Sequence, residues 1–226
     1  MEKEAIDIDR SNKLQDIFNN NAWVTFLLCC LVGSIILYVQ QNFVRTEEVY
    51  FNTYGDQLTL ERISELIQVQ KKWHYLSHLL IPLSYLLQIS LVVVCVSIGF
   101  ALNGLKVEFK KLYAIVTNAT IVFLIGKALN LLILLVIGIN RLDDELNLDK
   151  FSLLGLIGKS NVDELLWYPL WLLNMFEILF MLLLAVGLCY NYSMNFRKSI
   201  GLVISTYGLG LLVWIMFVLF FQLTYS

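Results

Sequence analysis

The chain has 226 residues, of which 58% are hydrophobic and 15% charged, with a mean hydropathy of +0.72 and a formal net charge of -2. A soluble domain carries about 25% charged residues, so this composition excludes an ordinary water-soluble globular protein. The slightly negative net charge is not that of a nucleic-acid-binding protein, which usually carries an excess of basic residues. All cysteines lie inside apolar stretches, which excludes a disulfide framework or a zinc site in the loops: Cys29, Cys30, Cys95 and Cys189.

The amino-terminal residues 1–22 are polar and mixed in charge, and we expect them to form a cytoplasmic segment. The apolar run that follows lacks an Ala-x-Ala cleavage pattern and is too long for the core of a signal peptide, so it is predicted to be a retained span. Five stretches are long enough to cross a hydrocarbon layer of about 30 Å as helices. They are 23–43, 79–102, 113–139, 165–190 and 199–222. The predicted fold is all-α, a polytopic membrane helix bundle with five transmembrane helices in one membrane domain, 23–226.

The charges between the spans predict the orientation. Positive residues concentrate in the 103–112 and 191–198 loops and in the amino-terminal segment, on what would be one side of the membrane. The loops on the other side are longer and acidic. Because cytoplasmic loops are enriched in lysine and arginine, the amino terminus is expected in the cytoplasm and the carboxyl terminus outside.

Two segments between the spans carry apolar residues of their own. Residues 58–73 place four of them on one helical face, which predicts an amphipathic helix: Leu60, Ile63, Leu66 and Ile67. Residues 151–158 are apolar but too short to span, which predicts an interfacial or re-entrant segment. Either segment would anchor the protein at the membrane surface or dock a partner. Pro82 and Pro169 are expected in the first turn of their helices, where a missing N–H is tolerated.

The second and third spans resemble the fourth and fifth. With one residue deleted, the two hairpins align over about 45 positions, a length typical of internal repeats. The matching motifs are Gly99-x3-Asn103-x5-Phe109 and Gly187-x3-Asn191-x4-Phe196. Such parallel repeats occur in several transporter folds, although chance and shared constraints on membrane insertion are alternative explanations.

Lys127 and Glu177 are the only charged side chains inside the apolar stretches. At about 1.5 Å per residue, both lie about 20 Å from the inner ends of their spans. Asn130 and Asn174 lie three residues further along, on the same helical faces. A charge at mid-membrane costs about 2.5–3.5 kcal/mol, so the sequence predicts a buried polar cluster of these four residues. The cluster would be a clasp between two helices or a site for a substrate or ion.

Other patterns carry little chemistry. His74 and His78 have a spacing that metal sites use, but no nearby acid completes such a site, so they are expected to be interfacial residues and no metal site is predicted. The Gly201-x3-Ser205 spacing predicts a close helix contact. No catalytic triad, carboxylate pair or phosphate-binding loop is present in the sequence, so we expect no enzyme and no cofactor.

Four short motifs are similar to a known family. They are Asn174-Met175-Phe176, the run 183–188 (LLAVGL), Arg197-Lys198-Ser199-Ile200 and Glu108-Phe109-Lys110-Lys111-Leu112. With them, residues 79–222 resemble the Yip1 family of five-span membrane proteins. The short amino-terminal segment favours the bacterial type, which implies an integral protein of the bacterial inner (cytoplasmic) membrane.

The leading hypothesis is a non-enzymatic membrane scaffold or accessory subunit of a transport, export or trafficking assembly. Its expected partners are the lipid bilayer and other membrane protein subunits, and no nucleic acid. The alternative is a small transporter or channel with a midplane polar site at Lys127 and Glu177.

Overall fold

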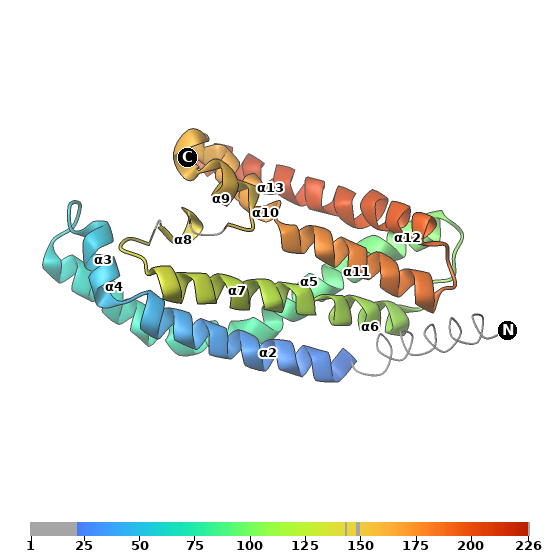
Figure 1. The fold of residues 1–226 in the computed structure, drawn as a ribbon, viewed down its shortest axis with the longest axis horizontal. Coiled ribbons are helices and arrows are strands. Elements are labelled where there is room, and N and C mark those ends of the chain that lie inside the picture. The colour runs from blue at the N-terminus through green and yellow to red at the C-terminus, as the bar shows by residue number, and fades with distance from the viewer. Residues whose placement is uncertain (1–21, 143, 148–149, 226) are drawn as a thin grey trace. The chain divides into compact units, whose positions relative to one another are not determined.

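Helices and turns make up the computed structural model, which describes residues 22–142, 144–147 and 150–225 (Figure 1). The helices are α2 (Ala22–Val39), the π-helix η1 (Gln40–Val44), α3 (Glu47–Tyr54), α4 (Leu60–Lys72), α5 (His74–Leu102), α6 (Phe109–Ala119), α7 (Ile121–Ile137), α8 (Asp144–Asn147), α9 (Leu153–Ile157), the 3-10 helices η2 (Lys159–Asn161) and η3 (Glu164–Leu166), α10 (Trp167–Leu172), α11 (Met175–Asn191), α12 (Phe196–Val203), the π-helix η4 (Ile204–Gly208) and α13 (Leu209–Tyr225). The described residues contain no strand. The predicted cytoplasmic segment lies outside the described residues except for Ala22.

Four helical stretches are long and apolar enough to cross a membrane: Ala22–Val44, His74–Leu102, Phe109–Ile137 and Phe196–Thr224. They coincide with the first, second, third and fifth predicted spans and extend several of them by a few residues. The all-α fold and the assignment to integral membrane proteins are therefore confirmed.

The fourth predicted span, 165–190, is not one helix. A break at Leu173 and Asn174 separates α10 from α11, and α11 has only 17 residues. Here the backbone pairs with residues 151–153: the Met175 N–H donates to the Phe151 carbonyl (3.0 Å) and the Leu153 N–H to the Leu173 carbonyl (3.0 Å). A helix of 17 residues is about 25 Å long, shorter than a hydrocarbon layer of about 30 Å. A fifth span thus remains a prediction.

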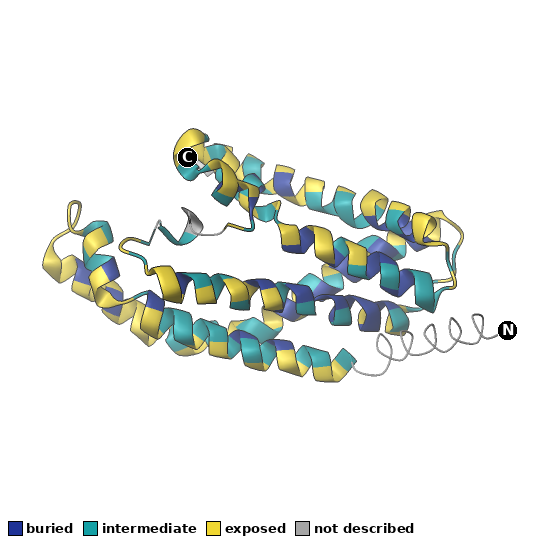
Figure 2. Ribbon diagram, viewed as in Figure 1, coloured by how far each residue is buried: buried dark blue, intermediate teal, exposed yellow. Residues whose placement is uncertain are grey.

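The helices divide into two compact units. The first contains Tyr85–Phe123, Phe176–Ser226 and the part of α2 up to Cys29. Its core gathers fifteen buried apolar residues from α5, α6, α11 and α12, seen as dark blue segments in Figure 2. Thr25 fastens α2 to α6 by a hydrogen bond from its hydroxyl to the Asn118 side-chain oxygen (2.5 Å).

Two glycines allow helices to pack closely against one another in the first unit. A Cβ at Gly99 would collide with the side chain of Thr206, and one at Gly210 would lie 2.8 Å from the sulfur of Cys95. At Gly201 it would meet nothing within 4 Å. Within the described residues no close contact therefore forms at the predicted face Gly201-x3-Ser205, because both residues are exposed. A contact with another chain at this face remains a prediction.

The two predicted hairpins end in similar turns. The Asn103 side-chain amide donates to the Gly99 carbonyl (2.8 Å), and that of Asn191 donates to the Gly187 carbonyl (2.9 Å). The Gly99 carbonyl also accepts the Asn103 backbone N–H (3.1 Å), so the side-chain amide adds a second hydrogen bond at that helix end. The glycine-asparagine motif behind the predicted repeat therefore has the same hydrogen bond in both halves.

The match continues past the asparagines. A residue with positive φ follows in each turn, Gly104 at 66° and Ser193 at 49°. The backbone N–H of the next residue then donates a hydrogen bond to the carbonyl five residues earlier, from Leu105 to Phe100 (2.9 Å) and from Met194 to Cys189 (3.0 Å). Such hydrogen bonds are typical of helices that end at a residue in the left-handed conformation, and their presence in both turns supports the repeat.

Tyr192 joins the two turns within the first unit. Its hydroxyl donates to the Glu108 carbonyl (3.4 Å), and its ring meets that of Phe100 edge-on at 4.7 Å. The Lys111 ammonium lies 5.8 Å from the ring centroid. Burial, and after it the charge of Glu108, raises the pKa of Tyr192 to about 12, so this hydroxyl stays protonated at neutral pH.

The second unit contains Cys30–Ser84 and Leu124–Met175. The amphipathic helix predicted at 58–73 is confirmed as α4, which buries Ile63 and Ile67 but leaves Leu60 and Leu66 exposed. The predicted face is thus too wide, since only the stripe of residues four apart packs inward.

The segment predicted as interfacial or re-entrant contains the short helix α9. Its N-cap is Ser152, whose hydroxyl accepts from the Gly155 N–H (3.1 Å), and both Ser152 and Leu154 are buried. The prolines differ in their placement. Pro169 is in the first turn of α10, whereas Pro82 lies inside α5 because that helix begins earlier than predicted, at His74.

Candidate functional site

The four residues of the predicted polar cluster differ in burial. Glu177 is buried on α11, with 6% of its surface exposed. Asn130 on α7 and Asn174 are half-buried, and Lys127 on α7 is exposed. A buried environment is thus found for Glu177 alone, and the meeting of all four side chains remains a prediction.

Asn174 does not have the helical relation to Glu177 that the spacing predicted. It precedes α11, forms an isolated antiparallel bridge with Ser152, and its side-chain amide donates to the Leu172 carbonyl (3.2 Å). This expectation is wrong because the helix starts one residue later, at Met175. Lys127 and Asn130 do lie three residues apart within α7, so they share a helical face as predicted.

Glu177 has a partner that the sequence interpretation missed. The Tyr207 hydroxyl donates a hydrogen bond to the Glu177 carboxylate. Tyr207 belongs to the π-helix η4, and its ring packs edge-on against that of Phe180 at 5.3 Å. π-Helical turns within α-helices occur frequently at functional sites. A tyrosine among the small residues of the last span was the available signal, since a buried tyrosine usually needs a hydrogen-bond partner.

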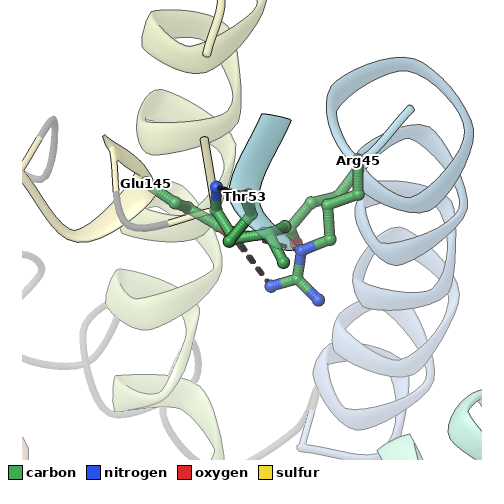
Figure 3. A network of polar contacts seen from close by, with 5 residues as sticks. Arg45, Thr53 and Glu145 are labelled. Atoms are coloured by element: carbon green, nitrogen blue, oxygen red, sulfur yellow. Dashed lines mark hydrogen bonds and ion pairs between the residues drawn. The ribbon is translucent and has the colours of Figure 1, made fainter. Parts of the chain in front are cut away.

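In the second unit, a polar network joins the end of the first span to the loop before α9. The Arg45 guanidinium binds both oxygens of Glu145, from Nε to Oε2 (3.1 Å) and from Nη2 to Oε1 (3.2 Å). The Gln40 side-chain amide also donates to Glu145. Figure 3 shows Arg45 and Glu145 pointing toward each other beside Thr53, whose hydroxyl accepts from the Leu142 N–H (3.0 Å).

Arg141 attaches the same loop to α3. Its Nε donates to the Asn52 carbonyl (2.9 Å), and its Nη2 pairs with Asp56 (3.1 Å). Its backbone N–H donates to the Asp144 carboxylate (2.9 Å). In the sequence, the acidic residues of these loops indicated only the orientation of the chain in the membrane. In the structure, Glu145 binds Arg45, and Asp56 and Asp144 bind Arg141.

We expect the Arg45–Glu145 pair to stabilise the second unit. The two side chains are 33% and 16% exposed, so their coupling should exceed the roughly 0.2–1 kcal/mol of surface pairs and reach about 2 kcal/mol. A double-mutant cycle with Arg45→Met and Glu145→Gln, followed by unfolding in mixed micelles, measures it.

A matched control is the exposed Arg62–Glu65 pair, whose side chains are 69% and 63% exposed. The corresponding cycle with Arg62→Met and Glu65→Gln should give no more than about 0.5 kcal/mol. Equal coupling in both cycles would contradict a structural role for the half-buried pair.

A pocket of about 350 Å³, lined by apolar surface together with several polar and charged side chains, adjoins this network in the second unit. We call it the Arg45 pocket, and define it by six of its lining residues: Gln41, Arg45, Glu47, Lys71, His74 and His78. Gln41 belongs to η1 and Arg45 directly follows it, and the others come from the start of α3, the last turn of α4 and the first turns of α5. Three tyrosines add hydroxyl groups to the lining: Tyr38, Tyr50 and Tyr75.

His74 and His78 line this pocket with ring centroids 5.9 Å apart. Within residues 22–142, 144–147 and 150–225, no group of three or more histidine, cysteine or acidic side chains is arranged to hold a metal ion. The two imidazoles belong instead to a pocket that also contains two donor-only side chains, Arg45 and Lys71, and amide and hydroxyl groups that both donate and accept.

The chain matches no protein-family model, no curated protein and no solved structure. Its function must therefore be argued from its own residues, and the resemblance to the Yip1 family remains a prediction. Beyond Tyr207, the sequence interpretation missed Arg45 and Gln41. Their signal was a run of polar residues directly after the first apolar stretch.

Proposed function

We propose that the chain is a non-enzymatic scaffold or accessory subunit of a transport, export or trafficking assembly in a membrane. The uncovered apolar surface of α13 carries the proposal. Among its described residues only Ile215 is buried, while large side chains such as Trp214, Phe217 and Phe220 are 47%, 52% and 65% exposed.

Aromatic rings order one side of this surface. The rings of Trp214 and Phe217 stack with centroids 5.9 Å apart, and those of Phe217 and Phe221 lie 4.7 Å apart. Helix association in a bilayer depends on packing of shaped surfaces, because lipid tails are as apolar as the side chains. The row of rings is a shaped surface of this kind, on which the helix of another subunit can pack.

The test is photocrosslinking in native membranes. A photoreactive amino acid in place of Phe217 should give one discrete adduct with a protein, and the partner should co-purify in constant ratio in mild detergent. The same replacement at Leu188, which is fully buried, should give none. Purification of a stable monomer with crosslinks to lipid alone would overturn the scaffold proposal.

A second candidate is a small transporter or channel with a midplane site at Lys127 and Glu177. The observation that favours it is the buried Glu177 carboxylate, held by Tyr207 of a π-helix. A carboxylate inside an apolar helix is by default a functional candidate. Proton flux into liposomes containing the purified chain, measured with a pH-sensitive dye, should then fall at least tenfold in Glu177→Gln. Flux equal to that of empty liposomes would exclude proton transport.

The bacterial Yip1-type topology is part of the proposal, with the amino terminus in the cytoplasm and α11 as a fifth span. Five spans place the termini on opposite sides, whereas four place them on the same side. Single cysteines at Lys106 and at Asp56, in a chain whose own cysteines are replaced by alanine, report the two sides. An impermeant maleimide added to intact cells should label the Asp56 position and not the Lys106 position. A third cysteine at Thr224 should be labelled with Asp56 if α11 spans.

A further inference from the structure

The Arg45 pocket lies where two apolar spans end. The span formed by α2 and η1 ends at Val44, directly before Arg45, and the span formed by α5 begins at His74. The ends of spans lie at the level of the lipid headgroups, where amphipathic aromatic residues are enriched. Tyr38 and Tyr75 line the pocket at those two ends, so a ligand there would meet phosphates and water rather than hydrocarbon.

The described lining contains two cations, Arg45 and Lys71, and each of them is paired with a carboxylate. The pair with Glu145 uses Nε and Nη2 of Arg45, and a guanidinium has five N–H donors. Lys71 pairs with Glu47 at 2.7 Å, but the two side chains are 64% and 61% exposed. An exposed pair of this kind is weak, so an incoming anion can share or replace the carboxylate as partner of Lys71.

Two further groups show that part of the pocket is shielded from water. The Gln41 side-chain oxygen is buried and has no hydrogen-bond partner among the described residues. A buried acceptor without a partner costs free energy until a donor reaches it. Burial also raises the pKa of Tyr50, whose hydroxyl bonds to Gln70. The pocket therefore has hydrogen-bond donors for an anion, and the Gln41 side-chain oxygen can accept a hydrogen bond from a hydroxyl or ammonium group.

We propose that the Arg45 pocket binds a phosphate ester of the size of a phospholipid headgroup. Arg45, Lys71 and His74 would donate to the phosphate oxygens, and Gln41 would accept from the alcohol or amine that the phosphate carries. Arginine and lysine are the usual partners of phosphate. The volume of about 350 Å³ suits a headgroup but not a whole lipid with its acyl chains. Glu47 is the only carboxylate among the described lining residues, which disfavours a bare metal cation.

The test compares ligands with and without phosphate on the purified full chain. In a maltoside detergent, native mass spectrometry measures the Kd of dihexanoyl phosphatidylethanolamine, of dihexanoylglycerol and of soluble glycerophosphoethanolamine. The phospholipid should bind at least tenfold more tightly than the phosphate-free diacylglycerol. Equal binding of these two lipids would overturn the proposal.

The soluble ester identifies the source of the phosphate. A phospholipid that binds at least tenfold more tightly than glycerophosphoethanolamine supports a membrane lipid as the ligand. Equal Kd values support a water-soluble phosphate ester, for which the acyl chains contribute nothing. Either result upholds recognition of the phosphate, and failure of both compounds to bind would refute it.

Matched variants locate the site. The double variant Lys71→Gln with His74→Gln should weaken phospholipid binding at least tenfold, whereas Lys72→Gln should leave it within twofold. Lys72 is the neighbouring exposed lysine on α4 and does not line the pocket. If the double variant fails to fold, Lys71→Gln alone should weaken binding about threefold, because this side chain is exposed and its loss is tolerated. Unchanged affinity in a folded variant would overturn the assignment.

Discussion

Glu177→Ala is expected to destabilise the protein by about 3 kcal/mol, because it removes the carboxylate to which Tyr207 donates and leaves a buried cavity. Glu177→Gln keeps the volume and an acceptor oxygen, so it should cost only about 1 kcal/mol. Unfolding of the purified chain in mixed micelles of mild detergent and dodecyl sulfate measures both. Equal stability of the wild type and Glu177→Ala would refute a structural role for this carboxylate.

The partner of Glu177 can be established with two cycles. Tyr207→Phe removes only the donor, and Glu177→Gln should cost less in that background than in the wild type. The predicted contact with Lys127 is tested in the same way with Lys127→Met. If Lys127 and Glu177 form a clasp, the double variant Lys127→Met with Glu177→Gln should lose less free energy of unfolding than the two single variants together. The reason is that the double variant leaves no uncompensated charge inside the membrane. Additive losses for Lys127 would confine the interaction of Glu177 to Tyr207.

The spans themselves were predictable because the length of an apolar stretch is a local property. A helix must satisfy its backbone groups inside hydrocarbon, so about 20 apolar residues suffice to identify it. The turn motifs at Asn103 and Asn191 were predictable for the same reason, since each asparagine bonds to a carbonyl four residues earlier.

The break before α11 was not predictable from the same pattern. Residues 167–173 are as apolar as a span, yet the chain leaves the helix at Leu173. The cause is a pairing with residues 151–153, about twenty positions earlier in the sequence. Hydropathy contains no information on such a pairing, and the helical relation assigned to Asn174 failed with it.

The hydrogen-bond partners of the charged residues could not be predicted from the sequence either. Tyr207 lies 30 residues from Glu177, and Arg45 lies 100 residues from Glu145. Which side chains of two helices face each other depends on the rotation of each helix about its own axis. That rotation is determined by packing at close contacts such as Gly99 against Thr206. The sequence therefore identified Glu177 as exceptional and could not identify its partner.

Packing at Phe180 provides the second large expected effect. This ring is fully buried in the core of the first unit, 4.8 Å from the ring of Phe123 and 5.3 Å from that of Tyr207. Phe180→Ala would leave a cavity in this core. Truncations of buried phenylalanine cost about 3–5 kcal/mol in soluble proteins. Lipid is as apolar as the core, so the transfer contribution is small in a membrane and the lower end, about 3 kcal/mol, is expected.

The matched control is Phe220→Ala on α13, where 65% of the side chain is exposed. Its loss should change the free energy of unfolding by no more than about 0.5 kcal/mol in the monomer. Phe180→Leu, which restores part of the volume, should recover about half of the loss seen with alanine. Mixed-micelle unfolding of the three variants gives all of these values. Equal losses for Phe180→Ala and Phe220→Ala would mean that the buried core contributes no more than the surface. In that case the stability of this protein would depend on the bilayer and its partners rather than on contacts between its own helices.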